Sequence, residues 1–264
     1  MRLQNKVIII TGSTTGIGKA IALRCAAEGA FVIVHGLEEE WGKLVADEIG
    51  KDRASYYIED ISIDGAPQRL VDLAVKTFGK LDAVVNNAAA IVSSNIHTTS
   101  KSFIQNVLEI NTIAPLLLIK AALPYLIEQH GCVLNIGSVN AWGGEPDLLD
   151  YSMSKGALMT MTRNLGDTLY RENGVRVNQV NPGWVLTEKE MQRKKQQGMA
   201  EDWYKDLPAV YAPSGRILKP SEIASAAVYW LSDECGPISG QVVELEQYPL
   251  IGRNPSKNTT TIKS

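Results

Sequence analysis

The sequence predicts a doubly wound α/β fold, and three observations support this prediction. Short runs rich in β-branched residues alternate with longer segments of helical periodicity along most of the 264 residues. Several of these runs are almost continuously apolar, which is typical of strands covered on both faces in a parallel sheet. With 45% hydrophobic and 21% charged residues, the chain has the composition of a globular protein that buries a sizeable core.

Seven strands are expected in chain order. They are KVIIIT (6–11), FVIVH (31–35), ASYYIE (54–59), LDAVVN (81–86), CVLNIG (132–137), VRVNQV (175–180) and QVVEL (241–245). Helical patterns between them lie near residues 16–28, 38–49, 64–78, 100–129, 151–172 and 220–232. This alternation predicts a Rossmann-type three-layer sandwich with a central, mostly parallel seven-stranded sheet.

The pattern indicates one domain over residues 1–250, without internal repeats or an interdomain linker. Residues 184–219 interrupt the alternation with a long polar and aromatic insertion, and insertions of this length often form functional lids. The remaining residues, 251–264, form a polar tail that is expected to be mobile unless a partner chain holds it.

The charge and hydropathy of the chain argue against two classes of partner. A net charge of −3 and a pI near 5.7 supply no general attraction for nucleic acid or for anionic lipid. The most apolar stretch, IAPLLLIKAALPYLI, is broken by Pro115, Lys120 and Pro124, so it is not expected to span a membrane. Arg2 is followed at once by the first strand, without the longer apolar run of a signal peptide. The expected location is the cytoplasm.

The cysteines and histidines do not indicate a metal site or a disulfide. Cys25, Cys132 and Cys235 are far apart and odd in number, and the histidines are equally scattered. The cysteines are therefore expected to be small buried residues in a reducing compartment, and no bound metal is predicted.

A glycine-rich loop, TGSTTGIG from Thr11 to Gly18, follows the first strand and opens the first helix. Its glycines allow a tight turn and a close approach of the backbone to a pyrophosphate. The amino terminus of the helix adds free N–H groups and a favourable dipole. Glycines before a helix are common, but at the first βα turn of a parallel fold they predict dinucleotide binding.

Tyr151 and Lys155 form a second pattern, because a lysine four residues on lies on the same face of a helix. An ammonium about 4 Å from a developing phenolate contributes about 4 kcal/mol at an effective dielectric near 20. This interaction would lower the pKa of the tyrosine from about 10 towards neutrality. Tyr151 is therefore a candidate general acid and base, whereas the pair alone could also be a surface tyrosine beside a helix-face lysine.

In this order and spacing, the motifs resemble those of the short-chain dehydrogenase/reductase family in its short single-domain form. The resemblance covers about residues 3–248. It is carried by TGSTTGIG, Asp60, NNAA (86–89), Asn111, Ser138, YSMSK (151–155), NPGWVLT (181–187) and GRILKPSEIA (215–224). It implies an NAD(P)-dependent oxidoreductase that interconverts a secondary alcohol and a ketone.

The resemblance implies four catalytic residues. Tyr151 would exchange the proton on the substrate oxygen while hydride moves to or from the nicotinamide, and Lys155 would also hold the nicotinamide ribose. Ser138 matches the serine that orients the substrate oxygen, and Asn111 matches the asparagine that positions a water in a proton relay.

The contacts of the cofactor also follow from the resemblance, from the pyrophosphate at the glycine loop to the carboxamide after the sixth strand. The expected set is Gly12, Thr14, Thr15, Gly16, Ile17, Gly18, His35, Gly36, Leu37, Asp60, Ile61, Asn87, Ala88, Tyr151, Lys155, Pro182, Gly183, Val185 and Thr187. Two departures bear on close packing. Ala89 stands where the family usually has glycine, and LEQY (245–248) replaces a pattern usually resembling VDGG.

The choice between NAD and NADP depends on the end of the second strand. An acidic residue there would bond the ribose 2′-hydroxyl of NAD, and an arginine would suit the 2′-phosphate of NADP. The sequence instead has Gly36 and Leu37, preceded by His35 as a candidate phosphate contact. The missing carboxylate favours NADP slightly, and the acids at 38–40 would repel a phosphate but are expected as the first turn of a helix.

The substrate pocket is expected at the carboxyl ends of the strands, between the 139–150 loop and the 184–213 insertion. Its candidate lining residues are Ser138, Asn140, Trp142, Glu145, Trp184, Trp203, Tyr204 and Tyr211. Aromatic rings with polar neighbours favour a small sugar- or polyol-like substrate, although the same rings could close a lid core. The run KEMQRKKQQ (189–197) would attract an acidic substrate or form a solvated helix face.

Two other functions are compatible with these motifs. A 3-ketoacyl-acyl-carrier-protein reductase would need a docking surface for an acidic carrier, and a non-catalytic dinucleotide-binding regulator would not need Tyr151. The resemblance also implies a homotetramer, with the helical patterns near 100–129 and 151–172 as candidate subunit contacts.

Overall fold

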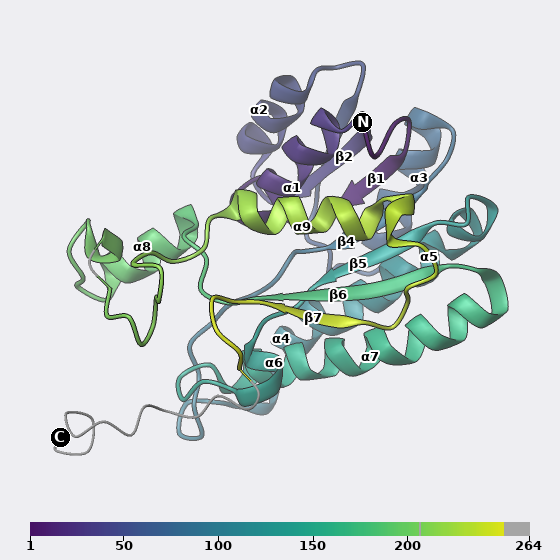
Figure 1. Cartoon of the computed structure of the whole chain (residues 1–264). Coiled ribbons are helices and arrows are strands. Elements are labelled where there is room, and N and C mark those ends of the chain that lie inside the picture. Colours follow the sequence, from purple (N-terminus) through teal and green to yellow (C-terminus); the bar gives the residue numbers. More distant parts are fainter. Residues whose placement is uncertain (206, 251–264) are drawn as a thin grey trace, which may run out of the picture.

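The computed structural model describes residues 1–205 and 207–250 and places seven strands in one parallel sheet (Figure 1). The strands are β1 (Val7–Ile10), β2 (Phe31–Gly36), β3 (Ala54–Ile58), β4 (Ala83–Asn86), β5 (Cys132–Ile136), β6 (Arg176–Pro182) and β7 (Val242–Leu245). Their order is β3-β2-β1-β4-β5-β6-β7, and every neighbouring pair is parallel. The predicted doubly wound fold is confirmed, whereas the predicted tail at 251–264 lies outside the described residues.

Helices cover both faces of this sheet and bury one apolar core on each (Figure 1). The main helices are α1 (Gly16–Ala27), α2 (Glu39–Ile49), α3 (Ala66–Phe78), α4 (Lys101–Leu108), α5 (Ala114–Glu128), α6 (Asn140–Gly143), α7 (Leu149–Asn173), α8 (Glu188–Gln196) and α9 (Pro220–Leu231). Along β1, Ile8 and Ile10 face the core that includes α1 and α9, while Val7 and Ile9 face the core that includes α3 and α5. This period of two explains why the strand is apolar throughout.

The helix predicted over 100–129 is interrupted. A π-helical turn at Glu109–Ile113 separates α4 from α5. Such a turn inserts one residue into the helical repeat and often lies at a functional site. The whole stretch Lys101–Glu128 is long and apolar enough, by length and composition, to cross a membrane. In the fold, Leu118, Ala122 and Leu126 of this stretch are fully buried in the core beneath the sheet.

The insertion between β6 and α9 contains structure that its polar sequence did not predict. It includes α8 and a short 3-10 turn at Trp203–Lys205. A separate small core forms around Trp203, Ala212 and Ile217, with Trp184 packed against it. We call residues 184–219 the lid segment, and its own core makes it a folded unit outside the main sheet.

Candidate active site

The glycine loop lies at the point where the sheet changes direction, between β1 and β4. Gly12 and Gly16 have φ angles of +62° and +57°, in the left-handed region that favours glycine. A Cβ atom on Gly18 would lie 2.3 Å from the carbonyl oxygen of Gly12, and one on Gly12 would lie 2.8 Å from the Cα atom of Ala88. Glycine is therefore required for this loop to pass over the end of β4 with its backbone exposed to a ligand.

Hydrogen bonds from the loop after β4 fix the glycine loop in place. The hydroxyl oxygen of Thr11 accepts the N–H groups of Asn87 and Ala88, both at 3.0 Å. The side-chain amide of Asn87 donates to the carbonyls of Thr11 and Gly12, both at 2.9 Å. Asn87 and Ala88 thus lie against the glycine loop, and their expected contact with the adenine ribose stays a prediction.

The amino terminus of α1 contacts a carboxylate from the lid segment. The Gly16 N–H donates to Oε2 of Glu188 at 3.1 Å, although the two residues are 172 positions apart. The methyl group of Thr187 lies 3.4 Å from the position that a Cβ on Gly16 would take. Because this N–H already binds an anionic oxygen, the loop and helix terminus fit the phosphates of the predicted dinucleotide. Sequence reasoning selected Thr187 and missed Glu188, which carries no motif of its own.

His35, near the end of β2, was expected as a candidate phosphate contact, and the structure gives it a different role. Burial lowers the pKa of His35 to about 4, and its Nδ1 accepts the Gly12 N–H at 3.4 Å. The imidazole is therefore neutral at physiological pH and supports the loop rather than supplying a positive charge to a phosphate. Leu37 is exposed, and Gly36 is pressed against Thr14, whose methyl carbon would lie 2.4 Å from a Cβ at that position.

Glu38 was expected only as part of the first turn of a helix, but in the structure it contacts the glycine loop. The hydroxyl of Thr14 donates to Oε2 of Glu38 at 3.1 Å. A carboxylate therefore lies against the glycine loop on the side of β2. After β3, the Asp60 carboxylate accepts the N–H and hydroxyl of Ser62 at 2.9 and 2.7 Å, and Ile61 is buried.

Ser138, Tyr151 and Lys155 are brought together at the ends of β5 and α7, and all three are buried. The Ser138 hydroxyl accepts the Asn140 N–H at 3.1 Å. The ammonium of Lys155 donates to the Ile136 carbonyl at 2.8 Å and lies 5.7 Å from the centre of the Tyr151 ring. Tyr151 is the third residue of α7 rather than the first, because the helix begins at Leu149.

Asn111 reaches the same site from the π-helical turn. Its side-chain amide accepts the Ala90 N–H at 2.8 Å and donates to the Ala90 carbonyl at 3.0 Å. The same NH2 group donates to the Ser154 hydroxyl at 2.9 Å, and that hydroxyl donates to the Tyr151 carbonyl at 2.7 Å. The inserted residue of the π turn therefore places Asn111 between the loop after β4 and the start of α7.

The pKa of Tyr151 is raised in the structure, whereas the sequence predicted that it would fall. Burial raises it to about 12, opposed by hydrogen bonding with Ser138 and by the charge of Arg193, and reinforced by the charge of Glu145. Burial also lowers the pKa of Lys155 to about 8. The predicted fall of the tyrosine pKa is wrong for this environment, because the cost of removing a phenolate from water exceeds the attraction of the nearby charges.

Arg193 is a site residue that the sequence indicated only as part of a basic run. It lies on α8 in the lid segment and pairs with Glu190 at 2.8 Å. Its Nε atom is buried and has no hydrogen-bond partner among the described residues. The lid segment therefore carries a guanidinium whose charge acts on Tyr151 and which keeps a donor available.

The predicted substrate residues fall into two groups. Asn140 and Glu145 are joined by a hydrogen bond of 3.3 Å beside Ser138, which places polar groups at the entrance to the site. Trp142 instead donates to Glu244 on β7, and its ring lies under the Arg163 guanidinium. Its indole is held by the scaffold.

Trp184 belongs to the core of the lid segment. Its ring stacks on Trp203 with centroids 5.0 Å apart, Lys194 lies over it, and its indole N–H donates to Glu190 at 2.8 Å. Of the two interpretations of these aromatic residues, the structure favours the lid core for Trp184 and Trp203, with Tyr204 beside them.

The loop after β6 follows the expected path past the site. The Val139 N–H donates to the Pro182 carbonyl at 3.1 Å, and the Gly183 N–H donates to the Leu245 carbonyl at 2.9 Å. Val185 forms a bridge with Leu218, and the Thr187 hydroxyl accepts the Glu190 N–H at the start of α8.

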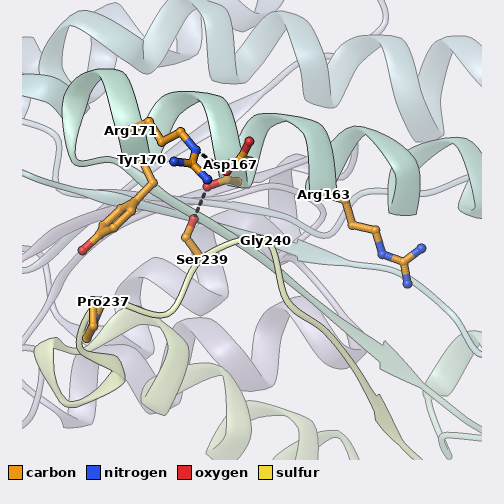
Figure 2. A pocket seen from close by; sticks show the side chains of 8 residues that line it. Arg163, Asp167, Tyr170, Arg171, Pro237, Ser239 and Gly240 are labelled. Atoms are coloured by element: carbon orange, nitrogen blue, oxygen red, sulfur yellow. Dashed lines mark hydrogen bonds and ion pairs between the residues drawn. The ribbon is translucent and has the colours of Figure 1, made fainter.

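A surface hollow of about 510 Å³ lies elsewhere on α7, away from Tyr151 (Figure 2). Residues of α7 face the loop before β7 across it, and the Ser239 hydroxyl donates to the Gly166 carbonyl at 2.7 Å. Its lining is Arg163, Gly166, Asp167, Tyr170, Arg171, Pro237, Ser239 and Gly240. None of the predicted site residues lines this hollow.

Comparisons with known proteins identify relatives that match over most of the chain. The model of a family described as Enoyl-(Acyl carrier protein) reductase matches residues 12–246. Glucose 1-dehydrogenase 2 of Bacillus subtilis is 35% identical over 90% of this chain and 92% of its own length. Meso-2,3-butanediol dehydrogenase of Serratia marcescens is 29% identical over 93% of this chain and 95% of its own.

A solved structure is also similar. The crystal structure of a 3-oxoacyl (acyl-carrier-protein) reductase from Agrobacterium tumefaciens C58 with NADP bound has a TM-score of 0.81 and 26% identity. The alignment covers 92% of this chain and 93% of that one.

The buried ammonium makes stability depend on pH. Lys155 has a pKa of about 8 in the fold and 10.5 when exposed, so the unfolded chain binds more protons between these values. Relative to a Lys155→Met variant, the wild-type free energy of unfolding should rise by up to about 3 kcal/mol from pH 8 to 10.5. Denaturant unfolding across this range measures it. Lys120 is exposed, so the wild-type free energy of unfolding relative to a Lys120→Met variant should not change with pH. An equal rise relative to both variants would contradict the prediction.

Proposed function

Since the chain belongs to the short-chain dehydrogenase/reductase family, we propose that it interconverts a secondary alcohol and a ketone on a small polar substrate. It is an NAD(P)-dependent oxidoreductase. The observation that carries the proposal is the convergence of the buried Ser138, Tyr151 and Lys155 side chains at the end of β5 and the start of α7.

The proposed chemistry divides between the cofactor and the side chains. When bound, the nicotinamide supplies or accepts the hydride. The Ser138 hydroxyl holds the substrate oxygen, and Tyr151 donates a proton to that oxygen in ketone reduction or removes it in alcohol oxidation. Asn111 links the start of α7 to the loop after β4, and a water held there would carry a proton from solvent to Tyr151 in reduction and from Tyr151 to solvent in oxidation.

Lys155 supports this proton transfer electrostatically. The Lys155 ammonium lies 5.7 Å from the centre of the phenol ring, and its positive charge favours a phenolate there. This attraction opposes the burial that raises the pKa of Tyr151. Because the pKa of Lys155 is about 8, the lysine carries its charge at neutral pH and loses it in alkaline solution.

A sugar- or polyol-like substrate is supported by polar groups around the catalytic tyrosine. Asn140 and Glu145 lie on one side, and the Arg193 guanidinium with its Glu190 partner lies on the lid segment. Hydroxyl-rich ligands use such donors and acceptors, whereas a long acyl chain needs apolar contacts. Two relatives, a glucose dehydrogenase and a butanediol dehydrogenase, are named for polyhydroxy substrates.

The alternative, a 3-ketoacyl-acyl-carrier-protein reductase, is favoured by the name of the similar solved structure. It requires a basic surface for an acidic carrier. Three of the four basic residues of α8 are engaged, because Arg193 pairs with Glu190, Lys195 pairs with Glu201 and Lys194 lies over Trp184. A regulator without catalysis is disfavoured because it would not need the buried catalytic set.

For the cofactor, we infer a small preference for NADP over NAD. The lack of a carboxylate at Gly36 and Leu37 supports it, as does the NADP bound in the similar structure. The Glu38 carboxylate at the glycine loop keeps the preference small, because it would repel a 2′-phosphate.

We also infer a cytoplasmic homotetramer built from single-domain chains. Exposed apolar side chains on the π turn, α5 and α7 support subunit contacts there, and they are Ile113, Leu116, Leu117 and Met153. Light scattering of the purified chain distinguishes a tetramer from a dimer.

Replacing Tyr151 with phenylalanine tests the proton transfer. The Tyr151→Phe variant keeps the buried ring and should lose turnover by about a hundredfold or more, because only the phenolic proton is removed. Cofactor affinity, measured by tryptophan fluorescence, should stay near the wild-type value. Tyr170→Phe on the same helix is the control and should turn over normally. Normal turnover in Tyr151→Phe would refute the assignment.

A substrate panel tests the chemical class. Sugars, polyols, keto acids and acyl thioesters are assayed in both directions with both cofactors. Polyols or sugars should give the highest kcat/KM, and the KM for NADPH should be slightly below that for NADH. Activity confined to long acyl thioesters would overturn the sugar-like proposal, and a lower KM for NADH would overturn the cofactor preference.

Glu188 should compete with the cofactor for the Gly16 N–H. Glu188→Gln removes the charge that α1 attracts, so the Kd of the cofactor should fall about two- to fivefold. Titration of tryptophan fluorescence measures this Kd without turnover. Glu201→Gln, on the same lid segment but paired with Lys195, should leave it unchanged. An unchanged or higher Kd in Glu188→Gln would show that the two anions do not compete.

A further inference from the structure

The sequence LEQY at 245–248, where the family usually has a pattern resembling VDGG, lies where both ends of the lid segment meet the sheet. Pro182 at the end of β6 pairs with Leu245 at the end of β7, and Figure 1 shows β7 ending beside the chain that leaves β6 for α8. The outgoing and returning chains also bond to each other, from Leu218 N–H to the Trp184 carbonyl at 2.9 Å. Residues directly after β7 can therefore contact both the outgoing and the returning chain.

Glu246 holds the outgoing end. Its Oε2 accepts the Trp184 N–H at 3.1 Å, while Oε1 accepts the N–H of Gln247 at 2.7 Å. A Cβ atom on Gly183 would lie 1.7 Å from Oε2 of Glu246. The carboxylate thus occupies space that exists only because residue 183 is glycine, and it fixes the loop directly after Pro182.

Gln247 holds the returning end. Its amide oxygen accepts the N–H and the hydroxyl of Ser214 at 3.0 and 2.6 Å, and its amide nitrogen donates to the Arg216 carbonyl at 2.7 Å. A backbone donor and a backbone acceptor are satisfied together, so the orientation of the amide is fixed. Glycine at this position could make neither bond through a side chain.

We propose that Glu246 and Gln247 are positioning residues that form a clamp: their hydrogen bonds hold both ends of the lid segment and so set the distance of that segment from Tyr151. They touch neither Ser138 nor Tyr151, and they act through the loop at Gly183 and through α8. The proposal rests on the proposed function for its kinetic consequences, while its mechanical consequence is independent of any substrate. Glu246 and Gln247, which stand in place of the family's usual pattern, then restrain the lid segment.

Gln247→Gly restores the glycine of the family pattern and tests the clamp directly. Loss of the bonds to Ser214 and Arg216 should raise the rate of tryptic cleavage within α8, which contains Lys189, Arg193 and Lys194, by about tenfold. The KM of the substrate should rise severalfold with a smaller fall in kcat, because the lid segment lies less closely against the site.

Two further variants separate the clamp from a general loss of stability. Glu246→Gln leaves one acceptor oxygen and should accelerate cleavage with a small change in Tm. Gln247→Glu keeps the acceptor for Ser214, loses the donor to Arg216 and should give an intermediate cleavage rate without the added backbone freedom of glycine. Gln241→Ala, at the exposed residue before β7, is the matched control and should behave as wild type.

A double-mutant cycle completes the test. Ser214→Ala should speed cleavage in the wild-type background and have little further effect in Gln247→Gly, because its bonding partner is already gone. Wild-type cleavage rates in both Gln247→Gly and Glu246→Gln would overturn the proposal. If wild type turned over no alcohol or ketone, the proposed function would fail, and the cleavage rates would still decide the clamp.

Discussion

The hydroxyl of Thr11 joins the two halves of the sheet at the edge where the candidate site lies. β1 and β4 are neighbours, but the strand order runs away from them in opposite directions. Two N–H groups, of Asn87 and Ala88, would lose their hydrogen bonds without this oxygen, and buried backbone groups are costly to leave unpaired. The glycine loop can lie on this support only because Gly12 and Gly18 lack side chains. The direction of α1, and therefore its contact with Glu188, follows from that fit.

Burial of Tyr151 and Lys155 is the second constraint. The same exclusion of water raises the pKa of Tyr151 to about 12 and lowers that of Lys155 to about 8. Both groups are thus driven towards their neutral forms, and charges in the site act against a large desolvation cost. The carbonyl of Ile136 and the charge of Arg193 on the lid segment are part of this balance. Proton transfer at Tyr151 therefore depends on how closely the lid segment is held.

The lid segment links these two constraints. Trp203, Ala212 and Ile217 form a small core within it, and hydrogen bonds to the rest of the fold lie at its ends. One contact reaches the helix α1 through Glu188, and the residues after β7 hold both ends of the segment. A single folded insertion thereby connects the glycine loop, Tyr151 and the last strand of the sheet.

By itself, the sequence determined the seven strands and most of the helices, because apolar periodicity is a local property. Its short motifs were also enough to propose Ser138, Tyr151, Lys155 and Asn111 as the catalytic residues. Only the tertiary structure decided the direction of the tyrosine pKa, the π turn under Asn111 and the neutral state of His35. It also decided that Trp142 and Trp184 are held by the scaffold and that Glu188 and Glu246 contact the ends of distant segments. These features depend on burial and on contacts between residues far apart in the chain, which no local pattern encodes.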